Sequence, residues 1–118
     1  MRPQWPKLPV AGSLNQTEME LLNLTDLPDP IREATIRAME SLKDFNIDTP
    51  DGANGLCVTA SDVVLDFYDQ ITNDYESEGV IRSGTSLHSF AEIKGYGIDL
   101  TARQFNPHEP FPKLWKIK

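Results

Sequence analysis

The spacing of apolar side chains changes near residue 72, and this change decides the fold class of the chain. Before that point, apolar residues recur every three to four positions, as in a helix that packs one face on a core. One stripe predicts a helix over residues 30–45, and a second predicts a helix from about residue 56 to residue 71. The two stripes are Ile31, Ala34, Ala38, Leu42 and Phe45, and then Leu56, Ala60, Val63, Val64, Phe67 and Ile71.

Beyond the second stripe, the pattern favours strands. Residues 80–82, 87–93 and 96–101 are short apolar segments of the kind that form a sheet. N-terminal helices followed by a small antiparallel β-sheet make an α+β domain. The 118 residues fit a single domain. We expect residues 1–13, which are rich in proline, to form an extended arm, and residues 106–118 to form an irregular tail.

The dipeptide at residues 94–95 is predicted to be a two-residue hairpin turn between the last two strands. Ile93 would then pair with Tyr96. This register places His88 and Asp99 on the same face of the sheet, one diagonal step and roughly 7–8 Å apart. The prediction depends on the turn, because a shift of one residue would send the two side chains to opposite faces.

The chain is acidic, with a formal net charge of −7. Nucleic acids and anionic membranes are bound by basic patches, so neither is expected as the main partner. No apolar run is long enough to cross a bilayer, and the N-terminus lacks the apolar stretch of a signal peptide. We therefore expect a protein that is made in the cytoplasm.

The motifs for cofactors and metals are absent from the sequence. It contains no phosphate-binding loop and no Gly-x-Gly-x-x-Gly motif, so nucleotide binding has no support. Its soft or imidazole ligands are Cys57, His88 and His108, and their spacing is not that of a metal site. We expect neither a cofactor nor a metal. A single cysteine also excludes an intramolecular disulfide.

Cys57 is predicted in the first turn of the second long helix. A loop over residues 48–55 precedes it, and Asn54 is a natural N-cap. The helix dipole and the backbone N–H groups of the first turn favour the thiolate, which is the nucleophilic form of cysteine. The same N–H groups can stabilise an oxyanion. The alternative is a buried structural cysteine, which is common in proteins.

His88 and Asp99 can supply the other two groups of a catalytic triad. An acid that holds one imidazole nitrogen fixes the tautomer, and the other nitrogen can then serve as the base. A nucleophile, a base and an orienting acid are the groups that attack on a carbonyl carbon requires. The sequence therefore predicts nucleophilic catalysis by Cys57, His88 and Asp99.

Two stretches resemble the papain-like and transglutaminase-like cysteine enzymes, and in particular the papain-fold toxin and effector domains of bacteria. NGLCVTASDVV is similar to their nucleophile helix, and HSFAEIKGYGIDLTARQF is similar to the core that carries their His strand and Asp strand. The resemblance covers residues 54–105. It implies that Cys57 is the nucleophile, that His88 is the general base and then the acid, and that Asp99 orients His88.

The same resemblance implies a function. It indicates a cysteine-dependent hydrolase or glutamine deamidase that acts on protein or peptide amides. It also suggests the toxic domain of a secreted bacterial effector, whose partners are a protein or peptide substrate and a cognate immunity protein.

The chain departs from papain at the oxyanion site. Papain has a glutamine shortly before its cysteine, whereas the nearest upstream polar side chain here is Asn54. Asn54 is either a helix cap or an oxyanion ligand, and Gln104 either lines the site or packs locally. Two other functions stay open. One is a non-catalytic binding or accessory protein with an inert Cys57, and the other is an acyl or amine transferase of transglutaminase type.

Overall fold

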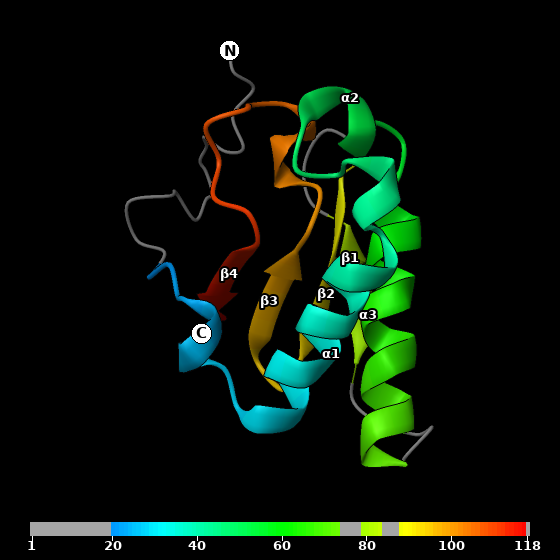
Figure 1. Cartoon of the computed structure of the whole chain (residues 1–118). Helices are drawn as coiled ribbons and strands as arrows, with labels where there is room; N and C mark the ends of the chain where they lie inside the picture. The colour runs from blue at the N-terminus through cyan, green and yellow to red at the C-terminus, as the bar shows by residue number, and fades with distance from the viewer. Residues whose placement is uncertain (1–19, 74–78, 84–87, 118) are drawn as a thin grey trace.

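The computed structural model describes residues 20–73, 79–83 and 88–117. Its helices come first and its sheet second, so the predicted α+β class is confirmed (Figure 1). The elements run in the order η3 (Leu24–Asp26), α1 (Asp29–Ser41), η4 (Lys43–Phe45), α2 (Pro50–Ala53), α3 (Cys57–Thr72), β1 (Val80–Ser83), β2 (Ser89–Ile93), β3 (Tyr96–Asp99), η6 (Ala102–Gln104) and β4 (Lys113–Lys116). The arm at residues 1–13 lies outside the described residues.

The four strands form one antiparallel sheet in the order β1-β2-β3-β4. The register pairs Ile93 with Tyr96 and Ala91 with Ile98, as the two-residue turn at residues 94–95 predicts. Both turn residues have positive φ, 52° at Lys94 and 86° at Gly95. Such angles are required in the turns whose twist matches a hairpin. The predicted pairing of β2 with β3 is therefore confirmed.

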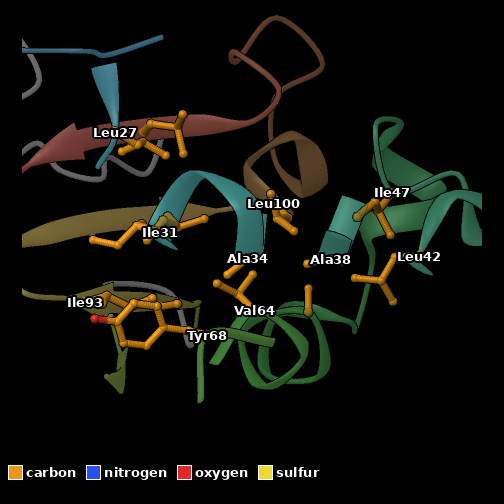
Figure 2. Packing of buried hydrophobic residues seen from close by; sticks show 14 residues of the cluster. Leu27, Ile31, Ala34, Ala38, Leu42, Ile47, Val64, Tyr68, Ile93 and Leu100 are labelled. Carbon is orange, nitrogen blue, oxygen red and sulfur yellow. The ribbon is translucent and has the colours of Figure 1, made fainter. Parts of the chain in front are cut away.

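The core lies between the two long helices and one face of the sheet. Ala34 and Ala38 of α1 are fully buried, and Figure 2 shows them beside Val64 of α3. Small residues at this contact let the two helices approach closely. The strands contribute a row from one face that includes Ala91 and Ile98, which pair directly across β2 and β3. This packing fixes α3, and with it Cys57, against the sheet.

The predicted helices differ from the observed ones mainly at their ends. The first was expected over residues 30–45, but α1 ends at Ser41 and a turn separates it from η4. The second was expected from about residue 56 to residue 71, and α3 spans Cys57–Thr72. It ends at Asn73, whose φ of 56° lies in the left-handed region that closes helices.

A short helix stands where a loop was predicted over residues 48–55. α2 begins after Thr49, whose hydroxyl accepts a hydrogen bond from the backbone N–H of Gly52 at 3.1 Å. Pro50 occupies its first helical position, where the missing N–H costs nothing. The prediction that Asn54 caps the next helix is wrong. Asn54 ends α2, and Leu56 is the N-cap residue of α3.

The prediction of an irregular tail over residues 106–118 is also wrong in part. Residues 113–116 form β4, which pairs antiparallel with β3. The prolines that suggested an irregular tail end at Pro112. Leu114 and Trp115 beyond them are buried, Leu114 in the helix-facing core and Trp115 opposite Gly97. Their burial on the sheet explains why the chain becomes regular there.

Candidate functional site

The predicted site residues lie at one end of the sheet. Figure 1 shows α2, the start of α3, the end of β3 and η6 together at the same end of the molecule, opposite the turn at residues 94–95. Cys57 begins α3, and Asp99 ends β3. His88 immediately precedes β2, which runs antiparallel to β3. Cys57, His88 and Asp99 thus lie at the same end of the fold, because each is located at or next to the end of a helix or strand.

His88 and Asp99 are joined by a buried hydrogen bond. The Nε2 atom of His88 lies 2.7 Å from the Oδ2 atom of Asp99. Their side chains are 0% and 3% exposed. The register accounts for the contact, because it sets the two residues on the same face and the side chains close the diagonal gap. The structure therefore brings together the pair that the hairpin turn was expected to align.

Asp99 is itself held in place by Thr101. Its Oδ1 atom accepts a hydrogen bond from the backbone N–H of Thr101 at 2.9 Å and one from the Thr101 hydroxyl at 3.3 Å. Both carboxyl oxygens are thus in use, and Thr101 is also buried. This role of Thr101 was not predicted from the sequence. The signal was present, since an aspartate two residues before a threonine readily forms such a local turn.

Cys57 is the first residue of α3 and is partly buried. The N-cap residue, Leu56, has no side chain that can bond to the first turn. The side chain of Ser61 donates to the carbonyl oxygen of Cys57 at 2.7 Å, which ties the first turn to the next. The predicted position of Cys57 in the first turn is confirmed. At such a position the backbone N–H groups point toward the entry of the helix.

Asn54 and Gln104 also meet, although they are 50 residues apart. The Nε2 atom of Gln104 donates to the Oδ1 atom of Asn54 at 3.4 Å, in an exposed contact. The amide oxygen of Gln104 is buried and accepts no hydrogen bond within the described part of the chain. This contact links η6 to the segment that leads into Cys57.

Phe105 lies against the ring of His88. The two ring centroids are 5.4 Å apart, and the planes meet at 76°, an edge-to-face contact. Phe105 directly follows Gln104, so a continuous path of contacts runs from Asn54 through residues 104–105 to His88. Phe105 was not predicted as a site residue. No pattern in the sequence identifies it, because its contact with His88 is set by tertiary structure.

Arg103 of η6 donates hydrogen bonds to two other segments of the chain. Its Nε atom donates to the carbonyl oxygen of Glu109 at 2.8 Å, and its guanidinium also donates to the carbonyl oxygen of Asp48 at 3.0 Å. Glu109 is further bound through its carboxyl group by the ammonium of Lys113 at 3.1 Å. These contacts position η6, and therefore Gln104 and Phe105, relative to the turn that precedes α2.

The described residues contain no group of three or more histidine, cysteine or acidic side chains placed to hold a metal ion. In the same ranges, no helix is long and apolar enough to cross a membrane. Comparisons with family models, with curated proteins and with solved structures found no match to this chain.

Proposed function

We propose that this chain is a cysteine-dependent hydrolase or deamidase of protein or peptide amides, of the papain-like kind. Cys57 would be the nucleophile, His88 the base and then the acid, and Asp99 the orienting group. One observation carries the proposal, namely the 2.7 Å hydrogen bond between the buried side chains of His88 and Asp99. Placing two ionisable groups out of water is costly, and such pairs often mark functional sites.

The hydrogen bond defines how His88 would act. In the neutral ring, the nitrogen that faces a carboxyl group carries the proton, so Asp99 holds the proton on Nε2. The Nδ1 atom is then the basic nitrogen. Thr101 holds the carboxyl group of Asp99, which in turn holds the plane of the imidazole ring. This is the arrangement that a base needs if it is to stay aligned with a thiol.

The start of α3 supports the role of Cys57. The dipole of this 16-residue helix places positive potential at its first turn. Leu56 contributes no capping side chain, so backbone N–H groups of the first turn can serve a developing oxyanion. A nucleophile and its oxyanion donors would then come from one helix end, and the base from the sheet.

The chemistry follows from these roles. The thiol proton of Cys57 passes to His88 as the sulfur attacks the carbonyl carbon of the amide. The carbon–nitrogen bond breaks, the proton passes from His88 to the departing nitrogen, and a thioester remains on Cys57. Water then gives a proton to His88 and attacks the thioester, and the carbon–sulfur bond breaks. The products are a carboxylic acid and ammonia or an amine, and the thiol of Cys57 is restored.

A labelling experiment separates this proposal from the non-catalytic alternative. We expect iodoacetamide at neutral pH to alkylate Cys57 in the native protein faster than in the urea-unfolded chain, because His88 would take up the thiol proton in the native site. The His88→Ala variant should lose this advantage, and the exposed His108→Ala variant is the matched control. A thiol that reacts only after unfolding would contradict the proposal.

The products distinguish deamidation, proteolysis and amine transfer from one another. Release of ammonia from a glutamine-containing protein would show deamidation, and new peptide termini would show proteolysis. Either activity should disappear in Cys57→Ala. Transfer to an added amine would instead support the transglutaminase type of reaction. Products that persist in Cys57→Ala would contradict the proposal for all three reactions.

The resemblance to bacterial effector domains supports a biological role that we propose with this chemistry. A toxic domain would arrest bacteria that express it in the cytoplasm, and a cognate immunity protein would relieve the arrest. We expect induced expression of the wild-type chain to slow growth, with Cys57→Ala as the matched control. Equal growth of the two strains, at equal protein levels, would contradict this role.

A further inference from the structure

We infer that Asn54 is a modification site, at which the folded protein loses the side-chain amide spontaneously through ring closure with the backbone nitrogen of Gly55. The reaction needs water but no enzyme, and it does not depend on the proposed function. Its basis is a contrast between two glycine-containing dipeptides in the segment before α3. The pair Asn54 and Gly55 is open, whereas the pair Asp51 and Gly52 is held inside α2.

The reaction has two steps. The backbone nitrogen of Gly55 attacks the side-chain carbonyl carbon of Asn54, a carbon–nitrogen bond forms, and the side-chain nitrogen leaves as ammonia with the proton of the backbone N–H. The product is a succinimide ring. Water then opens the ring at either of its two carbonyl carbons. One opening gives aspartate, and the other gives isoaspartate, in which the main chain runs through the former side chain.

The open pair offers the groups that ring closure requires. The attacking nitrogen must be available, and the N–H of Gly55 donates no hydrogen bond within the described part of the chain. A side chain on the second residue would hinder the attack, and glycine has none. Asn54 and Gly55 are both exposed, so water reaches the ring and ammonia can leave.

Ring closure also requires the backbone to rotate between the two residues. The ψ angle of Asn54 is 123°, so its carbonyl group must turn before the nitrogen of Gly55 meets the side-chain carbon. The space around Gly55 is open, because a Cβ placed there would have no neighbour within 4 Å. The hydrogen bond from Leu56 to the carbonyl oxygen of Ala53, at 3.1 Å, spans the dipeptide. Rotation therefore disturbs this bond but meets no packing around Gly55.

The pair Asp51 and Gly52 can form the same kind of ring, but the fold prevents it. The N–H of Gly52 donates to the hydroxyl of Thr49 at 3.1 Å. A Cβ at Gly52 would clash with the carbonyl oxygen of Asn46, so the backbone is closely packed there. The nitrogen is occupied, and rotation has to wait until α2 opens. A reaction that needs local opening is slowed in proportion to how rarely the open form is populated.

The modification changes the segment that leads into Cys57. Either product adds a negative charge shortly before the first turn of α3, in a chain whose formal net charge is already −7. Isoaspartate also lengthens the main chain between α2 and α3 and displaces the group that accepts the hydrogen bond from Gln104. The start of α3 therefore differs between newly made and aged protein.

The Asp51→Asn variant makes the test direct, because the chain then contains two Asn-Gly dipeptides whose conversion gives the same mass gain. The native and the urea-unfolded chain are incubated in otherwise identical, mildly alkaline buffer, and peptide mapping by mass spectrometry follows both positions. At each position the native rate is divided by the unfolded rate. We expect this ratio to be at least about tenfold higher at residue 54 than at residue 51. Asn54→Gln is the control and should abolish conversion at residue 54 alone, because glutamine closes its larger ring slowly.

A ratio at residue 54 no higher than that at residue 51 would overturn the inference. So would a native chain that stays unconverted at residue 54 while the unfolded chain converts. If Asp51→Asn does not fold, the wild-type chain gives the same comparison, since Asp51 isomerises through the same kind of ring and is detected as isoaspartate. Equal protection of the two positions there would also overturn the inference. Alkylation of Cys57 tests the proposed function separately, so either can fail without the other.

Discussion

Two of the hydrogen-bonded pairs in the site differ in almost every physical respect. His88 and Asp99 are buried and 2.7 Å apart, and Asp99 is held by Thr101. Asn54 and Gln104 make an exposed contact of 3.4 Å, and one amide oxygen of that pair accepts no bond among the described residues. The first pair is fixed by strand register, whereas the second joins the short helix η6 to the residue that ends α2.

The difference shows which side chains of the site are held in fixed positions. A buried hydrogen bond cannot be replaced by water when it is broken, so its loss leaves a polar group unsatisfied. An exposed bond exchanges with water at little cost. The proposed base and its orienting acid are therefore held rigidly, while Asn54 and Gln104 are free to adjust.

Asp99→Asn should have a large effect on activity. The amide keeps the shape of the side chain but can donate to Nε2, which favours the wrong imidazole tautomer. We expect Cys57-dependent turnover to fall by about 10³–10⁴-fold, as for loss of the acid in other triads. The measurement is the rate of acetyl-Cys57 formation from p-nitrophenyl acetate. The double variant with His88→Ala should be no slower than His88→Ala alone, and additive losses would contradict a shared role.

Asp99→Ala should have the largest effect on stability. It leaves the buried Nε2 of His88 and the backbone N–H of Thr101 without their acceptor. We expect the free energy of unfolding to fall by about 2–4 kcal/mol. Urea unfolding followed by fluorescence measures the change. A loss below about 1 kcal/mol would show that water reaches the pair and that its burial is less complete than the structure indicates.

Thr101→Val should have a moderate effect. It removes the hydroxyl that lies 3.3 Å from Asp99 but keeps the backbone hydrogen bond to the same oxygen. The expected loss is about 1 kcal/mol of unfolding free energy. Thr101→Ser retains the hydroxyl and serves as the matched control. If serine and valine destabilise equally, the methyl group of Thr101 matters rather than its hydrogen bond.

Asn54→Ala and Gln104→Ala should have the smallest effects. Each removes one side of an exposed contact, for which changes within about 0.5 kcal/mol are usual. A double-mutant cycle on urea unfolding measures their coupling, which we expect to be below about 0.5 kcal/mol. A coupling above about 1 kcal/mol would contradict the contrast drawn above. It would show that this contact, like the buried one, holds the site together.

Much of the site could be predicted because it depends on local signals. The turn at residues 94–95 has the length and residue types of a tight hairpin, and this alone aligns His88 with Asp99. Helical spacing places Cys57 in the first turn of α3. The class of the fold follows from the change of period along the chain. In each case the information lies within a few residues of the feature.

The parts that could not be predicted depend on competing or distant contacts. Asn54 has the chemistry of an N-cap, but α2 ends on it and the φ of 80° at Gly55 redirects the chain before α3 begins. The prolines before β4 suggested an irregular segment. The pairing of β4 with β3 is a long-range contact, which no local sequence pattern indicates. The ring contact of Phe105 with His88 likewise has no sequence signal.

The turn at residues 94–95 has a consequence for how this sequence can change over time. It lies at the opposite end of the sheet from the site, about 20 Å from His88 at the rise of an extended strand. Surface turns usually tolerate insertions and deletions. Here one added or lost residue would reverse the face on which His88 or Asp99 stands, without altering either side chain. The length of this turn should therefore be inherited as strictly as the identity of the residues that it aligns.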